Sequence, residues 1–192
     1  TVNMLGCHDG IPMLDLKGLV PEEHNQALID LIVARGGLIK NLHGQKNVYY
    51  QVNATYYSAL GADDRKMLLA RAIQLFMPGK PQVWYLDLFA GKNDLEAVHR
   101  GGEAAHKEIN RTNLTSEQVK AGLEQPVTRD QIKLLRLYNG CPAFDGELTV
   151  EQPETHRLCL RWRKGNSQAS LDADLRTLAF TARMDGETFV QA

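Results

Sequence analysis

Short apolar runs stand between longer polar segments in the first ninety residues of the chain. The first run is Val2 to Leu5, which is mostly apolar and is broken at Gly6. The longest apolar stretch covers residues 83–90 and is interrupted by Asp87. Runs of this length and composition are typical of buried parallel strands. We therefore predict a strand at each place, the second over residues 81–89.

Two helices are predicted between these strands. Pro21 suits the first position of a helix, two glutamates follow it, and the glycines at 36 and 37 stop it. The apolar residues that recur at helical spacing in between are Ala27, Leu28, Leu31 and Ile32. Asp63 can cap a second helix over residues 64–76, which is apolar nearly all round and should be largely buried. This order of strands and helices is typical of parallel α/β units.

The remaining segments before residue 142 are polar or short. Residues 38–53 and 91–113 are predicted to be two long loops, and connections of that length are often functional. Two short helices should follow, because Thr115 with Gln118 and Thr128 with Gln131 are capping-box patterns.

After Pro142 the pattern changes to short strands. Runs at residues 147–151, 156–163, 168–174 and 178–184 are separated by turn signals at 165–167 and 185–186. We predict an antiparallel β domain over residues 143–192. Residues 1–142 hold only two predicted parallel strands, whereas a complete (β/α)8 TIM barrel takes about 250 residues. If residues 1–142 are barrel material, they form its last quarter, and the earlier strands lie upstream of Thr1.

Composition narrows the class of protein. The chain has 192 residues and a net charge of −1, which gives no general attraction to nucleic acid or to anionic membranes. No apolar stretch is long enough to span a bilayer. The three cysteines lack metal-binding spacing and are interpreted as reduced thiols of a cytoplasmic protein. Thr1 opens directly into a strand, so we expect the chain to be part of something longer.

The first candidate for chemistry is the dipeptide His8-Asp9. It follows the first predicted strand and precedes a segment that Pro12 and two glycines keep from being a regular helix. The carboxyl ends of strands are where α/β barrels hold their active sites. The dipeptide could instead be a chance pair that caps a loop, and these residues alone favour that interpretation.

Four stretches, in order, resemble one family. They are residues 6–12 (Gly-Cys-His-Asp-Gly-Ile-Pro), 49–61, 78–94 and 108–111 (Glu-Ile-Asn-Arg). Together they resemble the sucrose phosphorylase group of the α-amylase superfamily, glycoside hydrolase family 13. The branch that they are most similar to includes sucrose 6'-phosphate and glucosylglycerate phosphorylases. The resemblance extends to about residue 145, and the predicted β domain also fits the family.

The resemblance implies a retaining phosphorylase that moves an α-glucosyl unit to phosphate and gives glucose 1-phosphate by double displacement. Such chemistry needs a close pair of carboxylates, which in this family lie on earlier strands. The isolated chain is therefore expected to be inactive and to need the upstream barrel segments as partners. The other partners are a sugar substrate and inorganic phosphate, with a homodimer left open. No cofactor and no metal are implied.

The resemblance also implies roles for single residues. Asp9 matches the carboxylate that stabilises the transition state, and His8 and Arg111 match groups that contact the glucose unit. Tyr50 and Gln51 match the loop that shapes the acceptor and phosphate site. The chemistry agrees for Asp9, because an ionised carboxylate stabilises an oxocarbenium-like centre.

A basic set of side chains lies on the two predicted loops. His43 can donate to a phosphorylated acceptor and can carry a positive charge when protonated. The lysines of the set are Lys40, Lys46, Lys92 and Lys107. A phosphate-binding role and a solvated surface are both open for them.

Two other functions remain open. One is a hydrolase or transglucosidase of the same superfamily, and the other is an amylase-like binding protein that has lost catalysis. The presence of His8, Asp9 and Arg111 argues against the second. The Tyr-Gln-Val-Asn motif at residues 50–53 favours phosphorolysis over hydrolysis, by resemblance.

Overall fold

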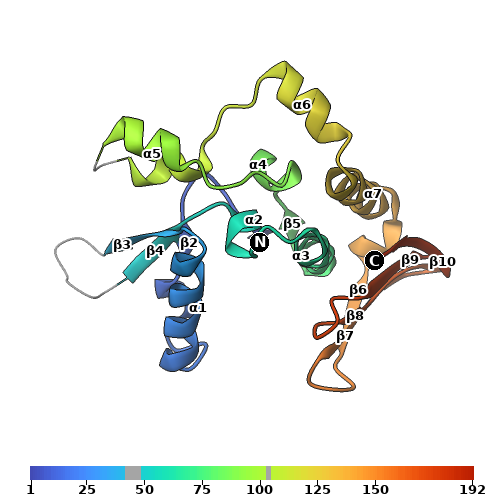
Figure 1. The fold of residues 1–192 in the computed structure, drawn as a ribbon. Coiled ribbons are helices and arrows are strands. Elements are labelled where there is room, and N and C mark those ends of the chain that lie inside the picture. Colours follow the sequence, from blue (N-terminus) through green and yellow to red (C-terminus); the bar gives the residue numbers. More distant parts are fainter. Residues whose placement is uncertain (42–48, 103–104) are drawn as a thin grey trace. The chain divides into compact units, whose positions relative to one another are not determined.

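The computed structural model describes residues 1–41, 49–102 and 105–192 (Figure 1). The chain divides into two compact units, each discontinuous in sequence. One consists of residues 1–5, 64–82 and 120–192, and the other of residues 6–63 and 83–119. Each is described below by itself. The predicted domain boundary at residue 142 concerns a longer protein and stays a prediction.

The first unit contains the parallel strand pair. Strand β1 (Val2–Asn3) pairs in parallel with β5 (Lys80–Pro81), so the two predicted strands are neighbours, although each is only two residues long. Helix α3 (Asp64–Phe76) has the bounds expected from the sequence and packs against α7 (Pro126–Gly140). Arg71 is fully buried between them, and its Nε donates to Gln131 Oε1 at 2.9 Å.

An antiparallel sheet of five strands completes this unit. Its strands follow in the order β10-β9-β8-β7-β6. They are β6 (Glu147–Glu151), β7 (Arg157–Lys164), β8 (Ser167–Asp174), β9 (Phe180–Met184) and β10 (Glu187–Gln191). The four predicted strands are confirmed. Strand β10 was not predicted; it pairs with β9 through the turn at Asp185-Gly186, where φ is +50° and +88°.

Aromatic side chains attach this sheet to the helices. Phe144, in the short helix η3 (Pro142–Asp145), lies with its ring centroid 5.0 Å from that of Phe76 and 5.9 Å from that of Trp162. The Nε1 of Trp162 donates to the backbone oxygen of Phe76 at 2.8 Å. Buried aromatic rings with a satisfied donor give a contact that is both apolar and specific in geometry.

The second unit is built around a small sheet of three strands. Strands β2 (Ile11–Pro12), β4 (Tyr49–Asn53) and β3 (Leu38–Asn41) pair antiparallel in the order β2-β4-β3. The connection from β2 to β3 contains η1 (Leu14–Leu16) and α1 (Glu22–Ala34), and α2 (Tyr56–Ala59) follows β4. One buried apolar cluster of this unit consists of Met13, Ile29, Ile32, Val52, Ala54 and Ala59.

Helix α1 starts after Pro21 and ends before the glycines, as predicted, and of the four apolar residues noted at helical spacing Ile32 is buried. Ile29 and Ile32 enter the core. Ala27 is exposed, and Leu28 and Leu31 are 43% and 44% exposed.

The two predicted long loops are wrong in part, because both contain regular structure. Residues 38–41 and 49–53 form the hairpin partners β3 and β4, with Ile39 opposite the fully buried Val52. The second segment contains α5 (Leu95–Gly101) and the 3-10 helix η2 (His106–Asn110). Asp94 caps α5, since its side chain accepts from Ala97 N at 2.8 Å.

The predicted strand over residues 81–89 is also wrong beyond its first residue. Strand β5 ends at Pro81, and residues 85–88 form one helical turn, α4 (Tyr85–Leu88). Two anchored side chains explain the turn. The Tyr85 hydroxyl donates to Thr112 O at 2.7 Å, and the buried Asp87 carboxylate accepts from Gly6 N at 2.8 Å.

The two predicted capping boxes differ in outcome. At the start of α6 (Ser116–Leu123), Thr115 and Gln118 exchange backbone-to-side-chain hydrogen bonds of 2.8 and 3.2 Å, which confirms the first. Thr128 caps nothing, because Pro126 already begins α7 and Thr128 is buried inside the helix. Within the described part of the chain, no helix combines the length and the apolar character needed to cross a membrane.

Candidate active site

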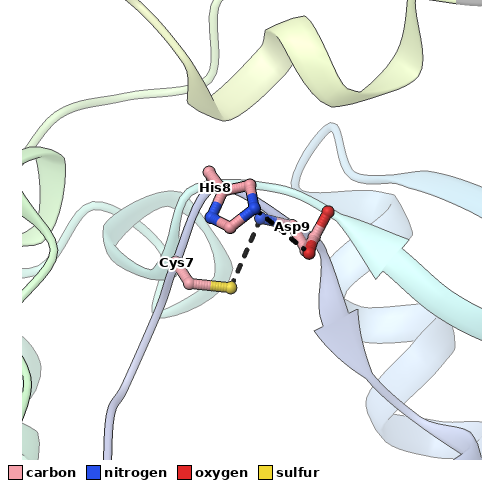
Figure 2. Close-up of side chains that lie close together, drawn as sticks. All are labelled: Cys7, His8 and Asp9. Atoms are coloured by element: carbon pink, nitrogen blue, oxygen red, sulfur yellow. Dashed lines mark hydrogen bonds and ion pairs between the residues drawn. The ribbon is translucent and has the colours of Figure 1, made fainter.

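The dipeptide His8-Asp9 lies in a tight turn between β1 and β2 (Figure 2). The turn is closed locally, because Asp9 N donates to Cys7 Sγ at 3.3 Å and His8 Nε2 stands 3.4 Å from Asp9 Oδ2. Gly10 ends the turn against β4. A Cβ at that position would come within 2.4 Å of Asn53 Oδ1, so the close approach requires glycine.

A second segment, distant in sequence, holds the backbone of this turn. The side-chain nitrogen of Asn110 donates to Cys7 O at 2.8 Å and to Asp9 O at 2.7 Å, and Asn110 is almost fully buried. Arg111 Nε donates to His8 O at 2.9 Å. Three consecutive carbonyls are thereby fixed by two side chains. Asn110 was not singled out from the sequence, although it lies in the stretch that carried the resemblance.

Positively charged side chains lie around the Asp9 carboxylate. Lys107 Nζ forms an ion pair with Asp9 Oδ1, and Arg111 Nη2 lies 3.7 Å from the same oxygen. The hydrogen bond from Lys107 is the main cause that lowers the pKa of Asp9, and the charges of Lys107, His8 and Arg111 add to it, while burial acts in the opposite direction. Asp9 is therefore ionised near neutral pH. Its side chain is 39% exposed, so it remains open to a ligand.

An aromatic side chain stands beside His8. The ring centroids of His8 and Trp84 are 6.1 Å apart, and the two planes are inclined by 54°. Trp84 precedes α4 in an extended conformation. The sequence placed it inside a strand and gave no sign of this contact. The His8 side chain is 60% exposed, so its imidazole can also reach a bound molecule.

Gln51 lies next to the turn in a polar pair on β4. Its Nε2 donates to Asn53 Oδ1 at 2.7 Å, and both residues are buried. Asn53 Oδ1 is the atom that approaches Gly10. For Tyr50 the structure describes the backbone in β4 only, and His43 lies outside the described residues, as does Lys46. The sequence-predicted residues that the structure brings together are thus His8, Asp9 and Arg111, with Gln51 adjoining.

The donor atoms of Cys7, His8 and Asp9 lie within 4.8 Å of one another, a spacing that a metal ion could bridge. The charges make this set a poor cation site. Lys107 and Arg111 already neutralise Asp9, and a divalent cation would have to compete with both. A neutral, hydroxyl-rich molecule fits better, since carboxylate oxygens accept from hydroxyls and a neutral imidazole can donate to one.

Comparison with known proteins decides the relationship. No protein-family model matches the chain. A sucrose 6(F)-phosphate phosphorylase of Ilumatobacter coccineus is 55% identical over 98% of this chain and 38% of that enzyme. An enzyme of the same name from Thermoanaerobacterium thermosaccharolyticum is 40% identical over 93% of this chain. The chain is a relative of the sucrose phosphorylases.

The fold agrees with that relationship. The crystal structure of sucrose 6F-phosphate phosphorylase from Thermoanaerobacter thermosaccharolyticum matches all of this chain with a TM-score of 0.92 and 38% identity. This sucrose phosphorylase relative spans about 38% of the length of the curated enzymes and 40% of the solved chain. The resemblance seen in the motifs is confirmed. The roles of individual site residues stay predictions.

Proposed function

We propose that the chain is the C-terminal part of a retaining disaccharide phosphorylase acting on sucrose 6'-phosphate or a similar α-glucoside. The products would be glucose 1-phosphate and the released acceptor, fructose 6-phosphate in the case of sucrose 6'-phosphate. The two relatives that are 55% and 40% identical to this chain both carry the name sucrose 6(F)-phosphate phosphorylase, which supports this substrate over plain sucrose or glucosylglycerate.

The observation that carries the proposal is the state of Asp9. Its carboxylate is ionised, partly exposed and held by cations from a distant segment. In an oxocarbenium-like transition state, positive charge develops at the anomeric carbon, and a fixed negative charge nearby lowers the barrier. Asp9 would supply that charge. His8 and Arg111 would contact the glucose unit, while the nucleophile and the acid/base would come from upstream barrel segments.

The proposed architecture follows from the parallel pair. Strands β1 and β5 would be the last two strands of a (β/α)8 barrel that covers residues 1–142 here, and residues 143–192 would form the C-terminal β domain. The parallel pairing of β1 and β5 with a helical connection supports this arrangement. The three cysteines are free thiols, which supports a cytoplasmic location.

The acceptor would bind beside the hairpin of β3 and β4. Gln51 adjoins the His8-Asp9 turn through Asn53, and Tyr50 precedes Gln51 on the same strand. His43 falls between the two strands in the sequence and would add a donor for a phosphate group, as the sequence suggests.

The test is an assay of the full-length parent enzyme with inorganic phosphate. Release of glucose 1-phosphate is measured for sucrose 6'-phosphate, sucrose and glucosylglycerate. We expect the highest kcat/KM with sucrose 6'-phosphate, and His43→Ala should weaken that substrate while leaving sucrose little changed. Phosphate-independent release of free glucose would instead indicate a hydrolase. Inactivity toward every sugar, with intact folding, would favour a binding protein.

A further inference from the structure

Lys107 stands out among the groups around Asp9. It comes from η2, which is 98 residues away in sequence, and its Nζ hydrogen-bonds to Asp9 Oδ1. Two further groups of the described residues stand at longer distances from the carboxylate, His8 Nε2 at 3.4 Å and Arg111 Nη2 at 3.7 Å. Lys107 therefore makes the tightest of these contacts, and it does so from a segment that Asn110 anchors to the same turn.

We propose that Lys107 is a positioning residue for the glucosyl transfer, which fixes the orientation of the Asp9 carboxylate. This inference rests on the proposed function and deepens it. An aspartate side chain rotates freely about two bonds unless something holds it, and misplacement by about 1 Å can cost roughly 10²-fold in rate. A lysine fixed through the neighbouring Asn110 supplies that restraint from outside the turn.

Among the described residues, the charged and titratable side chains that face Asp9 come from two segments. His8 and Cys7 come from its own turn, and Lys107 and Arg111 come from the opposing segment. Glu108 Oε1 lies 3.7 Å from Arg111 Nη1, so Arg111 pairs with a second carboxylate besides that of Asp9. Loss of Lys107 would leave Asp9 with the more distant Arg111, so the pKa of Asp9 should rise toward its ordinary value.

The test uses the full-length enzyme and compares Lys107→Met with Lys107→Arg. We expect Lys107→Met to lower kcat by on the order of 10–100-fold and to move the acid limb of the kcat/KM profile to higher pH. Lys107→Arg keeps the charge and should restore most of the activity. Lys164→Met is the matched control, because Lys164 also pairs with an aspartate, Asp145, at 3.2 Å, and should leave both quantities unchanged.

A double variant separates positioning from a merely structural role. If Lys107 acts through Asp9, adding Lys107→Met to Asp9→Asn should cause little further loss of kcat. An equal loss in both backgrounds, or an unmoved acid limb in the single variant, would overturn the inference.

A 13C titration of the Asp9 carboxyl, assigned by its disappearance in Asp9→Asn, reads the same shift without turnover. The proposed function fails if the wild-type enzyme is inactive on all three sugars. The inference on Lys107 fails by itself if Lys107→Met leaves the Asp9 titration unchanged.

Discussion

At the scale of single residues, Gly10 allows the His8-Asp9 turn to lie directly against β4. An added Cβ would come within 2.4 Å of Asn53 Oδ1 and 2.8 Å of Val52 O, and the second of these is backbone that cannot rotate away. We expect Gly10→Ala in the full-length enzyme to lower the free energy of unfolding by about 1–3 kcal/mol. The turn should also shift, so kcat should fall by roughly 10²-fold. Urea unfolding and steady-state kinetics measure the two effects.

Gly140→Ala provides the control for that experiment. It makes the same chemical change at the end of α7, where an added Cβ would meet nothing within 4 Å. Activity should be unchanged, and stability should be equal or slightly higher because alanine favours helix over glycine. Wild-type turnover in Gly10→Ala would show that the turn does not need its close approach to β4.

Single residues also differ in how well the sequence predicted their place in the candidate site. His8 and Asp9 are adjacent in sequence, so a turn at the right place brings them together, and Arg111 was reached through the family resemblance. Lys107 appeared only as one of several basic residues with an open role. Its ion pair depends on η2 folding back onto the turn, and nothing local in the sequence encodes that contact across about a hundred residues.

At the scale of elements, local signals predicted the helices best. Pro21 and Asp63 mark helix starts by a mechanism that acts within one turn, and α1 and α3 begin where these residues indicate. The hairpin of β3 and β4 was missed because its buried positions include Gln51 and Asn53, which are paired with each other. Such burial depends on a partner and leaves no alternating apolar pattern.

The attachment of the five-stranded sheet to α3 rests partly on one hydrogen bond. Trp162 Nε1 donates to Phe76 O at 2.8 Å inside a buried aromatic cluster. Trp162→Phe keeps an aromatic ring but removes the donor and leaves a buried carbonyl with one partner fewer. We expect a loss of about 1–3 kcal/mol in the free energy of unfolding, measured by urea denaturation of the full-length enzyme.

Tyr138→Phe is the comparison for this variant. Its hydroxyl also donates to a backbone oxygen, that of Gly79 at 3.3 Å, but this bond is exposed to solvent. Water can replace it, so the change should be small. If Trp162→Phe costs no more than Tyr138→Phe, the buried hydrogen bond contributes little and apolar contact alone holds the sheet on α3.

At the scale of the whole molecule, the chain exposes apolar side chains on elements that parallel α/β proteins normally cover. Val2 and Met4 are 56% and 43% exposed, and Leu28 and Leu31 of α1 are similarly exposed. Since the chain spans about 38% of its curated relatives, we propose that the rest of the parent covers these positions.

The isolated 192-residue chain should release no glucose 1-phosphate and should be poorly soluble. Size-exclusion chromatography and the phosphorolysis assay test both; a monodisperse, cooperatively melting or active chain would contradict this expectation.

The most direct test of the proposed role of this chain is Asp9→Asn in the full-length enzyme, with kinetics and thermal melting measured on one preparation. Asparagine keeps the size and one acceptor oxygen, so the sugar should still bind and KM should change little. The negative charge that faces the developing cation is lost, and we expect kcat to fall on the order of 10²–10³-fold while the protein stays folded. Turnover within a few-fold of the wild type in a folded Asp9→Asn variant would contradict the assignment of Asp9, and with it the proposed active site.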